Sequence, residues 1–183
     1  MDTLGLLNEI QRRSELSKSQ HFNAAERCKY VSNILNTPVI VINVALGSVF
    51  FYAINNEIPE LAKWIGAFLA LVAALCSGFH RFYNFESAME AHRAIGNKYL
   101  AVRDKCQRSQ ALYEDGFITG EDLVKSLNNI QETVTAIREE DAGCPTCAID
   151  FKRAKRSYEM KHYSKVKRIQ VRESDRSFSP RIV

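Results

Sequence analysis

The residues of this 183-residue chain best suited to chemistry are its five cysteines, two of which stand close together. Cys144 and Cys147 have the CxxC spacing found in zinc sites and in redox-active dithiols. Structural zinc needs four ligands, however, and only His162 lies near this pair in the sequence. No βαβ pattern surrounds the pair, as a thioredoxin-like redox motif would require. We therefore expect an ordinary turn at Cys144 and Cys147, with a metal or redox role as the weaker alternative.

Other motifs that carry chemistry are missing from the sequence. It contains no phosphate-binding Gly-rich loop, no nucleophile elbow and no paired-histidine motif. His80 and Arg81 follow an apolar segment, where ending a membrane helix is a simpler role than lining a vestibule. His92 falls among apolar residues at helical spacing, which favours a packing role. The sequence therefore predicts a protein that is not an enzyme and uses no cofactor.

Two long segments, 30–56 and 64–80, contain no Asp, Glu, Lys or Arg and are rich in Leu, Ile, Val, Phe and Ala. A membrane-spanning helix needs about 20 mostly apolar residues. Helices that are apolar on every face are rare in small soluble domains, so a buried pair of soluble helices is the weaker alternative. We predict spans at about 36–55 and 62–79, joined by an outside loop at 56–61. Pro38 is expected at the first helical position of the first span, after a capping Asn36 or Thr37.

Positive charge near the spans predicts their orientation. Five Lys or Arg residues lie between positions 12 and 29, and six lie between 81 and 108. The connecting stretch 55–63, counted with the residues that flank the loop, carries Glu57, Glu60 and only one basic residue, Lys63. Because Lys and Arg accumulate on the cytoplasmic side of membrane proteins, both termini are expected in the cytoplasm.

The spans contain one amide and a series of small residues. Asn43 needs a hydrogen-bond partner at membrane depth, and a helix–helix contact and a pore lining are equal alternatives. Gly47 lies four residues further on, on the same face. Small residues at intervals of four let helix backbones approach closely, either within one chain or between subunits. In the second span these residues are Gly66, Ala70, Ala74 and Gly78.

Beyond the second span, apolar residues recur at intervals of three and four. One such stripe runs from Phe85 to Tyr113 and predicts a helix ending near Glu114. Thr119 and Asp122 form a capping box, after which a second stripe continues through 123–137. We expect the two helices to pair as an antiparallel hairpin, with part of the first stripe left over for contacts between subunits. The candidates for this oligomer seam are Phe85, Ile95, Tyr99 and Val102.

A last helix is expected to begin near Ala148 and to carry many basic residues. Such a face can bind anionic lipid, an acidic partner or a nucleotide ligand, and a merely solvated basic face is the alternative. Aromatic residues are too few here to favour direct binding of nucleic acid. The candidates are Lys152, Arg153, Lys155 and Arg156.

The predicted fold is all-α, a two-helix transmembrane hairpin with a long cytoplasmic helical stalk. Residues 1–33 form an N-terminal cytoplasmic helical segment, whose sparse apolar residues, such as Leu4 and Leu7, suggest that it packs on another part. Residues 34–80 form the hairpin and residues 81–172 the cytoplasmic helical region. The polar residues 173–183 are expected to be a disordered tail.

This order of parts resembles the SLATT family, the two-transmembrane effector domains associated with SMODS nucleotidyltransferases and SLOG sensors. The similarity covers about residues 10–165. It rests on Phe-Asn-Ala-Ala-Glu-Arg at 22–27, on Ala-His-Arg-Ala-Ile-Gly-Asn-Lys-Tyr-Leu at 91–100, on the helix at 123–137 and on the helix-breaking Pro145. The two cysteines near Pro145 are not a feature that this resemblance explains.

The resemblance implies an effector of bacterial antiviral defence, acting through abortive infection. Such a protein would assemble as a homo-oligomer and form a pore in the inner membrane, or perturb that membrane. Its trigger would be a nucleotidyltransferase, a reverse transcriptase or a nucleotide-sensing partner. The resemblance supplies no active-site residues. A non-conducting membrane adaptor that recruits a cytoplasmic partner through its basic helical region is the alternative function.

Overall fold

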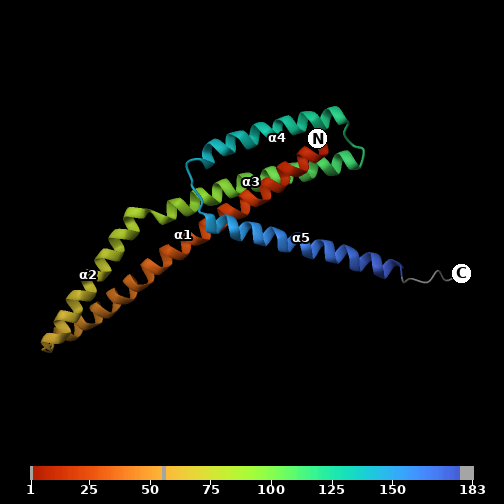
Figure 1. Ribbon diagram of the computed structural model, residues 1–183. Helices are drawn as coiled ribbons and strands as arrows, with labels where there is room; N and C mark the ends of the chain where they lie inside the picture. Colours follow the sequence, from red (N-terminus) through yellow and green to blue (C-terminus); the bar gives the residue numbers. More distant parts are fainter. Residues whose placement is uncertain (1, 55–56, 178–183) are drawn as a thin grey trace. The chain divides into compact units, whose positions relative to one another are not determined.

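The computed structural model describes residues 2–54 and 57–177, which form helices and no strands, as the all-α prediction requires. These residues divide into two compact units. The hairpin unit is Ala25–His92, and the bundle unit combines Met1–Ala24 with Arg93–Val183. In chain order the helices are α1 (Thr3–Ala53), α2 (Glu60–Tyr83), α3 (Phe85–Glu114), α4 (Gly120–Asp141) and α5 (Ala148–Ser177) (Figure 1).

The hairpin unit turns its large apolar side chains outward. In the most apolar part of α1 none of the residues is buried, and in that of the stretch formed by α2 and α3 only 6% are. Trp64 and Phe51, for example, are 76% and 72% exposed. An exposed apolar surface of this extent is unfavourable in water, whereas it is compatible with a lipid environment. Both helices are long and apolar enough to cross a membrane, which disfavours the alternative of a buried soluble helix pair.

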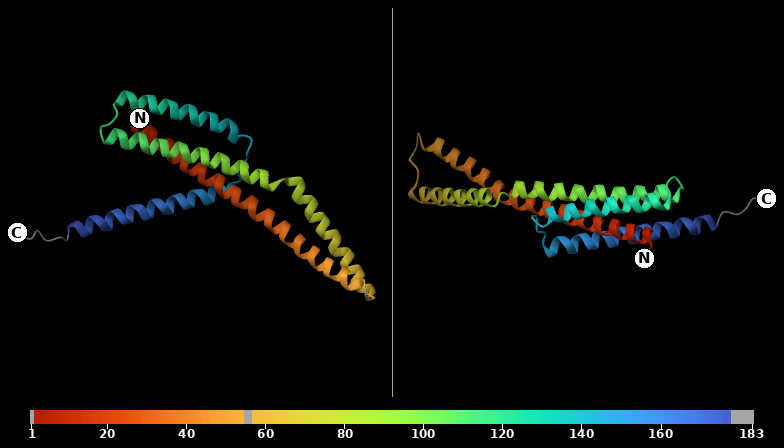
Figure 2. Two further views of the ribbon diagram at one scale, coloured as in Figure 1. Left: turned by 180° about the vertical axis from the view of Figure 1, so that it is seen from behind. Right: turned by 90° about the horizontal axis from the view of Figure 1, so that it is seen from above.

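The expected helix start at Pro38 is wrong. α1 runs without interruption from Thr3 to Ala53, with Pro38 inside it (Figure 2). A proline inside a helix removes one hydrogen bond, here the bond that its nitrogen would donate to the carbonyl of Ile34. The long helical segments on both sides outweigh that local loss. Asn36 and Thr37 are consequently interior helix residues rather than N-caps, and the N-terminal segment is continuous with the first span.

In the bundle unit, α3 and α4 lie side by side as an antiparallel pair, as the two apolar stripes predict (Figures 1 and 2). The capping box at the start of α4 is confirmed, since the Thr119 hydroxyl accepts from the backbone N–H of Asp122 and the Asp122 carboxylate accepts from that of Thr119. Before it, Gly116 takes a φ of 74°, and the N–H of Phe117 bonds the carbonyl of Leu112 at 2.9 Å. A left-handed glycine of this kind is the usual way to end a helix.

The first turns of α1 complete the core of the bundle unit. Leu7 is fully buried there, and Leu4, Leu6 and Ile10 are partly buried against the same core. The N-terminal segment therefore packs on the α3–α4 pair, as its sparse apolar residues suggest. The other buried members of this core are Ile95, Tyr99, Val102, Cys106, Leu123, Leu127, Ile130, Val134 and Ile137.

This core changes the interpretation of the oligomer seam. Ile95, Tyr99 and Val102 are 4%, 4% and 1% exposed within a single chain. Because α1 covers the surface that the α3–α4 pairing leaves free, these three side chains have almost no area left for a second copy. Phe85 is half-buried. A seam between copies stays a prediction, and of the four candidates only Phe85 keeps exposed surface for it.

α5 extends further than the sequence suggests. It is helical to Ser177, so the expectation of disorder from Glu173 is wrong for 173–177, whereas 178–183 lie outside the described residues. No glycine or proline interrupts the sequence between Ala148 and Ser177, and Arg and Glu are good helix formers. Of the predicted loop at 56–61, Asn56 lies outside the described residues, residues 57–59 are not helical, and α2 begins at Glu60.

Candidate functional site

The two helices of the hairpin unit are joined by a polar contact at one end. His80 on α2 lies 2.9 Å from the hydroxyl of Ser32 and 2.9 Å from the amide nitrogen of Asn36, both on α1. The amide nitrogen of Asn36 can only donate, so Nε2 of His80 accepts this hydrogen bond. His80 therefore does more than end a membrane helix, because it ties α2 to α1.

The small residues of α2 do not form the continuous contact that their spacing suggests. A Cβ on Gly66 would lie 3.6 Å from the side chain of Leu46, whereas Ala70, Ala74 and Gly78 are exposed. Each step of four residues advances about 40° beyond a full helical turn, so the series rotates away from α1. The residues of α2 that are not exposed recur mostly at intervals of three and four instead: Ala62, Gly66, Leu69, Val72, Ala73, Cys76 and His80.

Asn43 points out of the hairpin unit. Its side chain is exposed and has no hydrogen-bond partner among the described residues. The hydroxyls of Ser48 and Ser77, by contrast, donate to the carbonyls of Val44 and Ala73 in their own helices, both at 2.9 Å. These two hydroxyls are thus satisfied within their own helices, while the amide of Asn43 is not. Gly47, one turn further on, is half-buried, with open space where a Cβ would lie.

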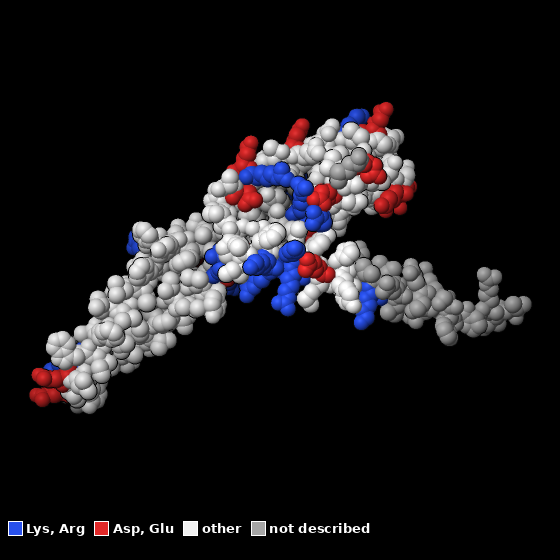
Figure 3. All heavy atoms as spheres, in the orientation of Figure 1, with Lys and Arg blue, Asp and Glu red and all other residues white. Residues whose placement is uncertain are grey.

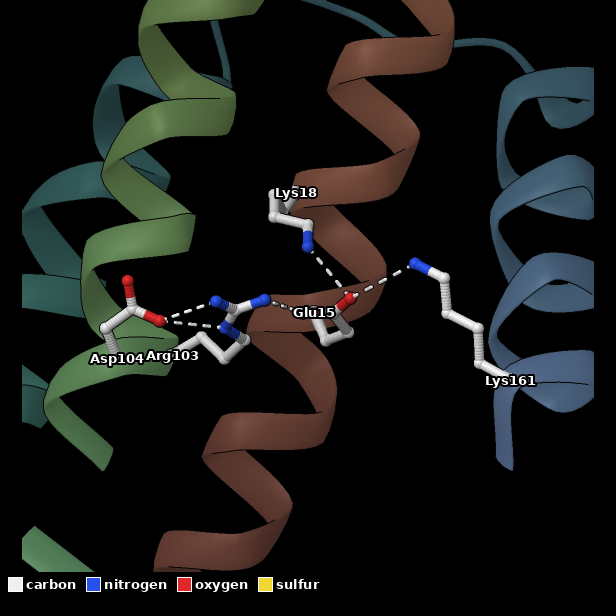
Figure 4. Close-up of polar contacts among 5 residues, drawn as sticks. All are labelled: Glu15, Lys18, Arg103, Asp104 and Lys161. Atoms are coloured by element: carbon white, nitrogen blue, oxygen red, sulfur yellow. Dashed lines mark hydrogen bonds and ion pairs between the residues drawn. The ribbon is translucent and has the colours of Figure 1, made fainter. Parts of the chain in front are cut away.

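In the bundle unit, Glu15 joins three helices. Its carboxylate lies 2.8 Å from Lys18 on the same helix, 3.0 Å from Arg103 on α3 and 4.0 Å from Lys161 on α5 (Figure 4). Burial works to raise the pKa of Glu15, but the hydrogen bonds and positive charges of Lys18 and Arg103 outweigh it and hold the pKa below its usual range. Arg103 also bonds Asp104 at 2.6 Å. Glu15 therefore stays ionised and fastens α3 and α5 to α1.

A cavity of about 580 Å³ opens beside this network. Its walls come from α1, α3 and α5 and carry both signs of charge, from Glu9 and Arg12 as well as from the network itself. The side-chain oxygen of Gln11, which also lines the cavity, is buried without a hydrogen-bond partner among the described atoms. The lining includes no serine, threonine or cysteine, so these walls offer polar contacts to a solute but no side-chain nucleophile of those types.

A second polar cluster lies at the end of α4. Nε2 of His21 lies 2.9 Å from one oxygen of Asp141, and the hydroxyl of Tyr99 donates to the other oxygen at 3.0 Å. Burial lowers the pKa of His21, although the charges of Asp141 and Asp150 oppose that effect. Burial, together with the charge of Asp141, raises the pKa of Tyr99 to about 12. A neutral imidazole and a neutral phenol therefore hold one carboxylate between α1 and α3.

The two cysteines at the α4–α5 connection are held by hydrogen bonds and by packing against the core. The carboxylate of Asp150 accepts from the backbone N–H of Cys147 at 3.2 Å and from its thiol at 3.0 Å. Asp150 is 1% exposed, and its carbonyl accepts from the side chain of Asn23 on α1 at 3.1 Å. Gln20 donates to Thr146 in the same connection. Cys147 thus acts at the start of α5 as a helix-capping residue, and Cys144 packs against the bundle core.

Within the part of the chain that the structure describes, no group of three or more His, Cys, Asp or Glu side chains is placed to hold a metal ion. Cys106, the buried cysteine of the core, has its pKa raised to about 11 by burial and is a packing residue. The four candidate basic residues of α5, at positions 152, 153, 155 and 156, are all exposed. Figure 3 shows Lys and Arg side chains along the first half of α5.

Sequence reasoning missed Glu15, His21 and Asp150. Their partners lie far away in the chain, such as Arg103, 88 residues from Glu15, and no local spacing marks such pairs. One sequence feature could have pointed to Glu15, namely its position among basic residues in the first half of α1. That pattern alone is compatible with a solvated surface.

Two outward-facing apolar helices attached to an all-α bundle define a small two-span membrane protein. The chain matches the model of the SMODS and SLOG-associating 2TM effector domain family 4 over residues 4–161. It therefore belongs to this SLATT family of membrane effector domains, and the resemblance seen in the sequence is confirmed. Comparison with curated proteins and with solved structures finds no significant match.

The two sequence segments that carried the resemblance meet in the structure. Phe22, from the first segment, lies against Gly96, from the second. A Cβ added at Gly96 would come within 3.2 Å of the Phe22 ring. Glycine at this position therefore lets α1 and α3 approach closely, and a larger residue would push against the ring.

Proposed function

We propose that the protein is an oligomeric effector of bacterial antiviral defence, which forms a pore in the inner membrane or perturbs it when a nucleotide-signalling or sensor partner triggers it. Membership of a two-transmembrane effector family supports the membrane role. The positive charges that flank the outer ends of both spans, with Lys63 as the one basic residue in the connecting stretch 55–63, support cytoplasmic termini. Two helices cannot enclose an aqueous path, so this function requires several copies.

The observation that carries this proposal is the unpartnered amide of Asn43. In hydrocarbon an unsatisfied amide costs about 2–7 kcal/mol, so a single hairpin surrounded by lipid is disfavoured. Contact with another copy, or with water in a shared pore, would satisfy the amide. The exposed small residues Ala70, Ala74 and Gly78 would let a second hairpin approach closely at the same time. Polar and small residues that are left exposed in one chain would thus make contacts between copies in an assembly.

Asn43→Leu tests the proposal because it removes the amide and keeps a side chain of similar size. We expect this variant to reach the membrane in normal amounts but to lose growth arrest and membrane depolarisation when expressed in the activated system. Ser48→Ala is the matched control, because the hydroxyl of Ser48 is already satisfied within α1. Undiminished depolarisation by Asn43→Leu, at equal membrane abundance, would show that the assignment of Asn43 is wrong.

The alternative of a non-conducting adaptor is supported by the exposed basic residues of α5. Purified protein in sealed liposomes separates the two functions, since only an effector that breaches the bilayer releases an entrapped dye. An adaptor would instead lose its biological activity on Lys155→Glu combined with Arg156→Glu, while Asn43→Leu would leave that activity intact.

A further inference from the structure

Between residues 149 and 163, α5 packs on the rest of the bundle unit through one face. Asp150 and Ala154 are 1% and 0% exposed, and Tyr158, four residues later, is half-buried. At about 100° per residue, these three side chains lie along one stripe of the helix. Outside this stripe, the residues of α5 between 149 and 163 are exposed.

The outer face of α5, opposite that stripe, combines basic and apolar side chains. Six exposed residues fall within an arc of about 100° on this side. The apolar members are not sheltered, since Ile149, Met160 and Tyr163 are 64%, 65% and 72% exposed. The basic members of the outer face are Lys152, Arg153 and Arg156.

The charge around this face has one predominant sign. Between positions 151 and 163 the sequence has five Lys or Arg residues and a single acid, Glu159. A helix whose exposed side mixes Lys and Arg with large apolar residues has the composition of helices that lie in the interface of an anionic bilayer. Each basic residue near such a surface strengthens binding about fivefold.

We propose that the outer face of α5 docks on the anionic surface of the membrane in which the hairpin unit is embedded. The basic residues would contact lipid phosphates, while Ile149, Met160 and Tyr163 would enter the boundary between headgroups and acyl chains. A bilayer is always close to this helix because the same chain is anchored in it, so a weak affinity suffices. This contact is independent of whether the hairpins form a pore.

An acidic protein is the competing occupant, and the observations favour lipid over it. The outer face offers long, flexible side chains around three separated apolar residues rather than one compact apolar centre. Protein interfaces instead concentrate their binding energy in a buried central cluster. Headgroups of a fluid bilayer can adjust to such a dispersed pattern.

The test uses the full chain in nanodiscs of phosphatidylcholine, with and without phosphatidylglycerol. The photoreactive p-benzoylphenylalanine replaces Tyr163 on the outer face or, as the control, Tyr158 on the packed face. We expect position 163 to cross-link to lipid in the anionic nanodiscs only, and position 158 in neither. Hydrogen exchange of 149–163 should slow in the anionic nanodiscs as well, which is a second readout free of any substitution.

Removing charge provides the decisive variant. Lys152→Gln, Arg153→Gln and Arg156→Gln together should reduce lipid cross-linking from position 163, by about fivefold for each charge removed. Lys105→Gln with Arg108→Gln, on exposed positions of α3, should leave it unchanged. Equal cross-linking in neutral and anionic nanodiscs, or an unaffected triple variant, would overturn the proposal. Cross-links to protein rather than lipid, in nanodiscs prepared directly from cell membranes, would overturn it in favour of the acidic partner.

Discussion

Leu7→Ala should destabilise the bundle unit strongly, although Leu7 lies far from α3 and α4 in the sequence. The side chain is 0% exposed and belongs to the same core as Val102 and Leu127. Three buried carbon groups at about 0.8 kcal/mol each give a transfer cost of about 2.4 kcal/mol. The remaining cavity raises the expected cost to about 3 kcal/mol, within the usual range for buried leucines. Amide hydrogen exchange of α3 and α4, measured on the full chain in nanodiscs, should accelerate by roughly a hundredfold.

Two variants separate loss of core packing from a general effect of substitution. Val124→Ala, on α4 but 44% exposed, should change the free energy of unfolding by no more than about 0.5 kcal/mol. Leu7→Met keeps most of the volume and should cost less than about 1.5 kcal/mol. If Leu7→Ala and Val124→Ala cost the same, then α1 is not the third member of the core and the reasoning is refuted.

Two further predictions concern the polar clusters of the bundle unit. Because burial lowers the pKa of His21, the unfolded state binds more protons than the folded one below about pH 6.5, and the free energy of unfolding should fall as the pH drops through that range. Hydrogen exchange at about pH 7.5 and about pH 5.5 should show this fall in the wild type and a smaller one in His21→Gln, and identical profiles would contradict it. Cys147→Ala removes the thiol donor from the buried carboxylate of Asp150 and should cost about 1–2 kcal/mol in urea unfolding of the bundle unit. Cys147→Ser, which keeps a donor, should cost clearly less, and an equal cost would show that this hydrogen bond does not matter.

The pairing of α3 with α4 was predictable because the residues that indicate it lie close together in the sequence of each helix. Apolar residues at intervals of three and four define one face of each helix, and the face from Leu123 to Ile137 is buried as expected. Thr119 and Asp122 mark the helix start within four residues. The two apolar spans were equally predictable, because their length and composition identify them without any knowledge of tertiary contacts. Their side chains, such as that of Trp64, are exposed in the structure. The basic residues of α5 were also found at exposed positions, as their sequence suggests.

Other features depend on information that the sequence does not display locally. Pro38 has the sequence context of a helix start, but its effect depends on the helix that surrounds it. Intervals of four in α2 suggested one contact stripe, whereas the rotation of the helix leaves Ala74 and Gly78 exposed. The hydrogen bonds of His21 and Asp150 join segments more than a hundred residues apart. Such pairs need the folded chain to bring them together.

The discontinuous bundle unit has a consequence for biosynthesis. Its first segment leaves the ribosome before either membrane span has been made, but its partners in α3 and α4 follow only after residues 25–92. At about 5–20 residues per second, Leu7 waits on the order of ten seconds for Leu127 to be translated. During that interval the apolar side of nascent α1 is open to chaperones and to the lipid surface. The hairpin is therefore complete in sequence before this core can form, and a ribosome that stalls before α4 leaves an α1 without the α4 side of its core.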